Sequence, residues 1–172
     1  MQLEQFKYFL RYEPHTGLFR WNMDRTRGVK AGDVAGGITS RGYREIHVQY
    51  KLYRASRLAW LYVHGPIPDG MQIDHINKNR SDDRIVNLRL ATPIENSRNK
   101  KMPITNTTGF KGVLLHKETG KFVASTKLNG KRLYFGTRHE TALEAALAYD
   151  AGVQSIHGEF ASLNFPLQRE AA

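Results

Sequence analysis

Residues 72–100 read Gln-Ile-Asp-His-Ile-Asn-Lys-Asn-Arg-Ser-Asp-Asp-Arg-Ile-Val-Asn-Leu-Arg-Leu-Ala-Thr-Pro-Ile-Glu-Asn-Ser-Arg-Asn-Lys, and this segment organises the first half of the chain. A short apolar strand is predicted to end on an acid and an imidazole, Asp74 and His75. The polar loop that follows is rich in side chains that compete with regular backbone hydrogen bonding. A second strand is predicted over 87–90, where polar and apolar residues alternate.

A helix is predicted to begin just after this second strand. Thr92 can cap it, the proline that follows suits the first helical position, and Glu95 completes a capping box. The helix would bring Asn96, Arg98 and Lys100 back towards the acid and the imidazole. One carboxylate, one imidazole and amide oxygens beside positive charge suit a hard metal ion and a phosphodiester.

The segment resembles the HNH nuclease motif, a ββα-metal (His-Me finger) unit, in the form found in phage and mobile-intron endonucleases. The three motif letters fall on His75, Asn87 and Asn96, at intervals of twelve and nine residues. The loop departs from the family at two positions. Lys78 replaces a common glycine, and Asp83 replaces a common asparagine. Both changes bear on the geometry of the loop, and neither falls on one of the three motif letters.

This resemblance assigns roles to four side chains. His75 is the expected general base, because an unperturbed imidazole titrates near ~6.5. Asp74 and Asn96 would offer oxygen atoms to one divalent metal ion, Mg²⁺ or Mn²⁺. Asn87 would not bind metal but would tie the loop so that His75 faces the scissile phosphate. Three basic residues are candidates for phosphate contacts, with a solvated basic face as the alternative: Arg89, Arg98 and Lys100.

The composition favours an anionic partner. The 172 residues carry a formal net charge of +10, with a pI near 9.9. Such a basic chain suits nucleic acid or a membrane surface. No run reaches the roughly 18 apolar residues of a membrane span, and neither a signal peptide nor a long basic amphipathic helix is apparent. Double-stranded DNA is therefore the expected partner, without membrane binding.

The chain contains no cysteine. This excludes disulfides and cysteine-ligated zinc, and it fits the cytoplasm of a bacterial host or a phage-infected cell. A monomer is expected because no dimer-forming helix is apparent, although a dimer stays open. A single catalytic motif per chain acts on one strand at a time, so nicking and double-strand cleavage also stay open.

Residues 1–70 are interpreted as a scaffold that braces the motif. A helix is predicted over 1–13, strands over 18–21 and 43–50, and a helix over 57–63. The alternative interpretation gives this region extra DNA contacts through four basic residues: Arg25, Arg27, Lys30 and Arg41.

The second half of the chain has a different pattern. Residues 101–109 are predicted to be a linker. Three short strands follow over 110–116, 121–128 and 131–136, and then a helix that Thr141 caps and Gly158 ends. Lysines and arginines gather on the strands and acids on the helix, so the sheet is expected to face an anion.

This half resembles the Apetala-two/ethylene-response-factor (AP-two/ERF) DNA-binding domain. The resemblance rests on Gly109-Phe110-Lys111-Gly112-Val113, Leu133-Tyr134-Phe135-Gly136-Thr137 and Glu144-Ala145-Ala146-Leu147-Ala148-Tyr149-Asp150. It implies that strand side chains read a DNA major groove. The candidate DNA contacts are Lys111, Lys121, Lys127, Lys131 and Arg132.

Together these patterns predict an α+β chain. A scaffold and nuclease domain would span 1–100, with the motif at 71–100. A domain over 110–166, with a three-stranded antiparallel sheet packed on one helix, would position the DNA before a tail at 167–172. The expected function is that of a DNA endonuclease that resembles homing endonucleases. Two alternatives remain, namely a sequence-specific DNA-binding regulator with a vestigial motif and a nonspecific nuclease.

Overall fold

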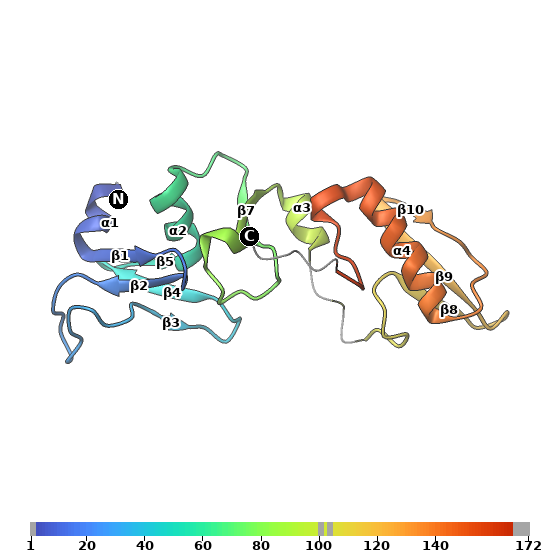
Figure 1. Cartoon of the computed structure of the whole chain (residues 1–172), viewed down its shortest axis with the longest axis horizontal. Coiled ribbons are helices and arrows are strands. Elements are labelled where there is room, and N and C mark those ends of the chain that lie inside the picture. Colours follow the sequence, from blue (N-terminus) through green and yellow to red (C-terminus); the bar gives the residue numbers. More distant parts are fainter. Residues whose placement is uncertain (1–2, 100–101, 103–104, 167–172) are drawn as a thin grey trace. The chain divides into compact units, whose positions relative to one another are not determined.

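The computed structural model describes residues 3–99, 102 and 105–166 (Figure 1). The chain divides into two compact units, Met1–Asn96 and Ser97–Ala172, called here the N-terminal and C-terminal units. Both combine helices with small antiparallel sheets, which confirms the predicted α+β class. No helix in the described part of the chain is both long and apolar enough to cross a membrane.

In its described residues, the N-terminal unit contains three small antiparallel sheets. β1 pairs with β2, the strands β3, β4 and β5 form a second sheet in that order, and β6 pairs with β7. The elements are α1 (Leu3–Phe9), β1 (Leu10–Glu13), β2 (Leu18–Trp21), β3 (Gly37–Ile38), β4 (Arg44–Val48), β5 (Lys51–Arg54), α2 (Ala55–His64), β6 (Gln72–His75), the 3₁₀ turn η1 (Ile85–Asn87), β7 (Leu88–Ala91) and α3 (Pro93–Arg98).

The helix predicted over 1–13 is wrong in its second half. In the described part, α1 ends at Phe9 and the chain continues at once as strand β1. β1 pairs with β2 in a register that sets Leu10 opposite Trp21. Both Leu10 and Phe19 are fully buried in this hairpin. Burying such a side chain stabilises the fold by about 1.5–3 kcal/mol, which outweighs the weak preference of a short segment for helix.

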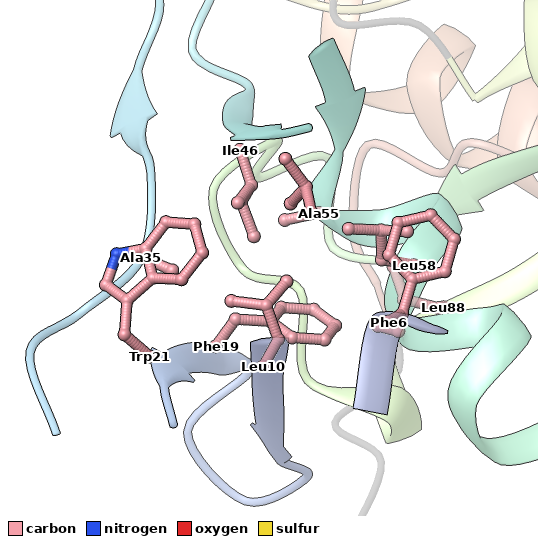
Figure 2. Close-up of a cluster of buried hydrophobic side chains, with 11 residues drawn as sticks. Phe6, Leu10, Phe19, Trp21, Ala35, Ile46, Ala55, Leu58 and Leu88 are labelled. Carbon is pink, nitrogen blue, oxygen red and sulfur yellow. The ribbon is translucent and has the colours of Figure 1, made fainter. Parts of the chain in front are cut away.

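The core of the N-terminal unit is built by the scaffold and the motif together. Figure 2 shows side chains from α1, β1, β2, β4 and α2 converging in one cluster. Leu88, from the first position of β7, belongs to this cluster and is 5 % exposed. The motif is therefore anchored in the same core as the scaffold rather than attached to its surface.

The motif has the ββα order that the sequence predicts. In the β6–β7 pair, Asp74 lies opposite Arg89 and His75 lies opposite Leu88. A capping box begins α3, in which the backbone N–H of Thr92 donates to Glu95 Oε2 (2.8 Å) and the Glu95 N–H donates to Thr92 Oγ1 (3.3 Å).

The C-terminal unit is a three-stranded antiparallel sheet in the order β10-β9-β8, with one long helix packed on it (Figure 1). Small alanines of the helix and Val113 of the sheet form the buried core. Gly112 has φ +74°, and a side chain there would collide with the ring of Tyr149. The elements are β8 (Val113–His116), β9 (Lys121–Leu128), β10 (Lys131–Tyr134), α4 (Ala142–His157) and the 3₁₀ turn η2 (Gly158–Phe160).

Candidate functional site

Asp74 and His75 end strand β6, and both side chains are buried. The guanidinium of Arg89 donates to Asp74 through Nε and also pairs through Nη2, each nitrogen lying 2.9 Å from Oδ2. The Arg89 side chain is itself only 11 % exposed. The structure thus places Arg89 against the predicted metal ligand, and its DNA contact stays a prediction.

The ring of His75 is held by an acid that the sequence analysis left out of the site. His75 Nε2 lies 2.9 Å from Oδ1 of Asp83, and Asp83 is 2 % exposed. Among the described residues, no hydrogen bond reaches the other carboxylate oxygen, Oδ2. Burial raises the pKa of the Asp83 carboxyl, and the hydrogen bond with His75 opposes that rise.

Position 83 is not a motif letter, but its carboxylate contacts one of the letters, His75, directly. Sequence reasoning had little chance of finding this, since Asp82 and Asp83 are adjacent and chemically identical. Asp82 instead forms a surface ion pair with Arg84, whose Nε and Nη2 both lie 2.7 Å from its oxygens. The one available signal was the acid at a position where the family often has asparagine.

The scaffold holds Asp83 in place from the other side. The hydroxyl of Tyr12, on β1, donates to the backbone carbonyl of Asp83 at 2.7 Å. Gly17, in the β1–β2 turn, has φ +73°, and a side chain there would collide with the backbone of Asp83 and Arg84. The β1–β2 hairpin therefore sets the position of the loop that carries the acid.

The side chain of Asn87 bridges the two ends of the same loop. Its Oδ1 accepts from the backbone N–H of Asn77 at 2.9 Å, and its Nδ2 donates to the carbonyl of Asp82 at 2.7 Å. Its backbone carbonyl also accepts from the N–H of Ile76 at 2.9 Å. Asn87 is 6 % exposed, so these bonds are shielded from water. The catalytic role assigned to it stays a prediction.

Asn96 projects from α3 towards β6. Its Nδ2 donates to Oε1 of Gln72 at 2.6 Å. Gln72 and Asp74 share one face of β6, because side chains alternate along a strand. The helix thus brings an amide over the face that carries the acid.

The donor set fits a hard divalent ion that keeps several waters. Among the described residues, no hydrogen bond reaches Oδ1 of Asn96, and Asp74 supplies a carboxylate. An amide oxygen and a carboxylate oxygen are ligands that suit Mg²⁺ or Mn²⁺. Within the described residues, no group of three or more His, Cys, Asp or Glu side chains is arranged to hold a metal. Water and substrate oxygens would have to complete any coordination shell.

The register of the C-terminal sheet divides the predicted DNA contacts between its two faces. Lys127 and Arg132 lie opposite each other on the face away from α4, and Tyr134 lies there too. We call this the outer sheet face; its members are Leu114, His116, Lys121, Val123, Ser125, Lys127, Arg132 and Tyr134. Lys131 pairs with Leu128 and belongs to the helix side.

The remaining basic candidates have intramolecular partners or lie outside the described residues. Lys121 forms an ion pair with Glu140. Nζ of Lys111 donates to the backbone carbonyl of Arg98 at 2.7 Å. Burial lowers the pKa of His157, and the positive charges of Arg98 and Lys111 lower it further. Lys100 lies outside the described residues.

Comparison with known proteins links the motif to a nuclease family. A family model described as HNH endonuclease matches residues 53–98, which contain α2 and the ββα motif. Protein 3.8 of Escherichia phage T7 is 39 % identical over 112 residues, covering 65 % of this chain and 91 % of that protein.

More distant relatives share part of the chain. An uncharacterized HNH endonuclease of Acanthamoeba polyphaga mimivirus is 35 % identical over 109 residues, which is 60 % of this chain and 52 % of that protein. Among solved structures, the HNH homing endonuclease I-HmuI is similar with a TM-score of 0.45 and 19 % identity. That similarity covers 58 % of this chain and 55 % of I-HmuI.

Proposed function

Because this chain belongs to the HNH endonuclease family, we propose that it is a DNA endonuclease in which His75 is the general base. One observation carries the proposal. The His75 ring ends the first strand of a ββα motif, fixed through Nε2 on the buried Asp83, with Asp74 beside it in sequence. An imidazole in a fixed orientation suits proton abstraction, because general-base catalysis depends first on geometry.

The path of the proton taken from water depends on which ring nitrogen of His75 carries the hydrogen. An ionised Asp83 accepts a hydrogen bond from Nε2–H, which assigns the basic lone pair to Nδ1 of His75. Water attacks phosphorus as its proton passes to Nδ1. The bond between phosphorus and O3′ breaks, and the departing oxygen takes a proton from solvent. The products are a 5′-phosphate and a 3′-hydroxyl, the polarity implied by the family resemblance.

Asp74 and Asn96 are the residues proposed to hold one Mg²⁺ or Mn²⁺. A bound divalent ion supplies positive charge that stabilises the crowded phosphate and the leaving oxygen. Arg89 shares the Asp74 carboxylate and so restricts its orientation, since two of its nitrogens lie 2.9 Å from Oδ2. Gln72 does the same for the amide of Asn96. Asn87 keeps the loop closed so that Asp83 stays against His75.

The C-terminal unit is proposed to bind double-stranded DNA through the outer sheet face, as an AP-two/ERF-like domain. Lys127 and Arg132 would contact phosphates or base edges from this face. Lys121 is also on this face, although Glu140 offsets its charge. A role in homing is a further proposal, which rests on the resemblance of the motif to phage and mobile-intron enzymes.

Plasmid cleavage tests the proposed function. Supercoiled plasmid is incubated with the full chain and Mg²⁺ or Mn²⁺, with and without a chelator, and the products are separated on an agarose gel. We expect open-circular or linear DNA only when the metal is accessible. An unchanged plasmid with both metals, from a protein that still binds DNA, would support the vestigial-motif alternative instead.

A further inference from the structure

Two arginines from distant segments converge on one aromatic ring in the N-terminal unit. The guanidinium carbon of Arg54, the last residue of β5, lies 4.2 Å from the ring centroid of Tyr43. The guanidinium carbon of Arg80, from the loop between β6 and η1, lies 4.9 Å from the same centroid. We call Tyr43, Arg54 and Arg80 the arginine stack. Its three members have no role in the function proposed above.

The arginine stack borders the proposed catalytic base. The ring centroid of Tyr43 lies 6.1 Å from that of His75, and the two planes meet at 52°. Arg80 lies five residues beyond His75, in the loop that also carries Asp83. A group bound to the stack would therefore sit next to the phosphate whose attacking water His75 is proposed to deprotonate.

The two charges are held in place although both side chains are exposed. Nη1 of Arg80 donates to the backbone carbonyl of Arg41 at 3.1 Å, and Gly42 lies beneath the Arg80 side chain. The residues that line the adjoining pocket are Thr39, Ser40, Arg41, Tyr43, Glu45 and Arg54. Glu45 is the one acid in that lining, and its carboxylate is 3.9 Å from Arg54 Nε.

We propose that the arginine stack binds a backbone phosphate of the DNA strand next to the scissile phosphate. This inference rests on the proposed nuclease function. Two planar guanidinium groups on one ring suit a phosphate, because each can donate two parallel hydrogen bonds. The Tyr43 ring contacts both side chains, and the Arg41 carbonyl also holds Arg80, so less conformational entropy is lost on binding. The pocket lining contains two arginines and one acid, Glu45, which leaves net positive charge there for the DNA to neutralise.

Salt dependence of binding provides the test, because it counts phosphate contacts. The full chain is titrated into a fluorescein-labelled DNA duplex of mixed sequence, without divalent metal, over a series of salt concentrations. Arg80→Ala and Arg54→Ala are each expected to weaken binding about tenfold at low salt. The logarithm of the binding constant falls linearly with the logarithm of the salt concentration, and we call the steepness of this line the salt slope. Each variant should also reduce the salt slope by about 0.9, the value for one lost phosphate contact.

Three further variants separate the stack from bulk charge and from folding. Arg57→Ala, on the exposed side of α2, removes the same charge and should leave the salt slope unchanged. Tyr43→Leu removes the ring that contacts both guanidinium groups and should weaken binding without changing the net charge. Arg80→Lys keeps the charge but loses the planar group, so the slope should persist while affinity falls a few-fold. Thermal melting of every variant confirms that it is folded.

Plasmid cleavage, measured in parallel, separates this inference from the proposed function. If the wild-type protein nicks plasmid while Arg54→Ala and Arg80→Ala keep the wild-type slope, the arginine stack is not a phosphate site. If the wild-type protein cuts nothing but both variants lose slope, the stack stands as a DNA-binding site and the nuclease proposal fails. Equal loss in the Arg57→Ala control would also overturn the stack, since the effect would be one of net charge.

Discussion

Asp83 in the N-terminal unit and Asp150 in the C-terminal unit are both buried aspartates, but their surroundings are opposite. Asp150 accepts three hydrogen bonds from the segment that follows α4. They come from the backbone and side-chain nitrogens of Asn164, each at 2.9 Å, and from the backbone N–H of Phe165 at 2.8 Å. Asp83 has one side-chain partner, His75 Nε2, and within the described residues its second oxygen is left without a hydrogen bond.

The two environments distinguish a structural acid from a candidate functional one. A buried carboxylate whose oxygens accept several amide hydrogen bonds stabilises the fold, since each such bond contributes about 1.5–3 kcal/mol. A buried carboxylate that is only half satisfied costs stability, and such a cost persists where it serves a site. Asp150 holds residues 164–165 against α4, whereas Asp83 holds the ring of His75.

The largest expected effect tests the imidazole itself. His75→Ala should lower plasmid cleavage by about 10²–10⁴-fold, because it removes the general base, and DNA affinity should stay within a few-fold. Plasmid nicking and fluorescence anisotropy measure the two quantities. Alanine leaves the Asp83 carboxylate without its partner, so His75→Ala/Asp83→Asn is the control for folding. A collapse of affinity in both variants would mean that His75 serves the fold instead.

The next effect distinguishes the two aspartates by activity. Asp83→Ala should lower the cleavage rate at saturating DNA by about ten- to a hundredfold, since the ring loses the acceptor that orients it. Asp83→Asn retains an acceptor oxygen and should restore most of that rate. Single-turnover cleavage separates the rate from affinity, which should not change. If Asp83→Ala cuts as fast as the wild type, the His75–Asp83 contact has no catalytic importance.

Replacing Asp83 with asparagine should also change how the stability of the fold depends on pH. Burial raises the pKa of Asp83 in the folded state. The contribution of this carboxyl to folding stability is therefore complete below the unfolded carboxyl pKa of about 3.9, and it is lost as pH rises through the folded pKa. The variant has no charge to bury. Its stability relative to the wild type should therefore increase from acidic to neutral pH, as measured by urea unfolding. A constant difference between the two proteins would contradict this assignment.

The matching change in the other unit should affect stability instead. Asp150→Asn presents an N–H group to amide donors, so the free energy of unfolding should fall by about 2 kcal/mol. Urea unfolding measures this loss, and cleavage by the folded protein at saturating DNA should be unaffected. A stable Asp150→Asn protein with a slow cleavage step would contradict the contrast between the two acids.

The smallest effect concerns the outer sheet face. Arg132→Ala should weaken DNA binding by about three- to tenfold and reduce the salt slope by about 0.9, because this side chain lies on the outer face beside Lys127. Lys131→Ala is the matched control, since Lys131 is next to Arg132 along β10 but its side chain lies on the opposite, helix-facing side of the sheet. Anisotropy titrations over a salt series compare the two variants. Equal losses would argue against recognition through one sheet face.

The sequence alone determined the elements whose signals are local. The capping boxes at Thr92 and Thr141 appear in the structure where they were predicted, and so does the ββα order. Spacing also singled out Asp74, His75, Asn87 and Asn96, although their roles stay predictions. These features depend on residues a few positions apart, so their hydrogen bonding and periodicity are apparent without knowledge of the fold.

Only the tertiary structure decided how these elements are held. The Tyr12 hydroxyl bonds to the Asp83 backbone across 71 positions of sequence, and Arg80 reaches the Arg41 carbonyl across 39. The change from helix to strand at Leu10 likewise depends on pairing with β2. Such contacts follow from side-chain packing and strand pairing between distant segments, which no local pattern encodes. They select which of two adjacent acids meets the imidazole and which arginines share a ring.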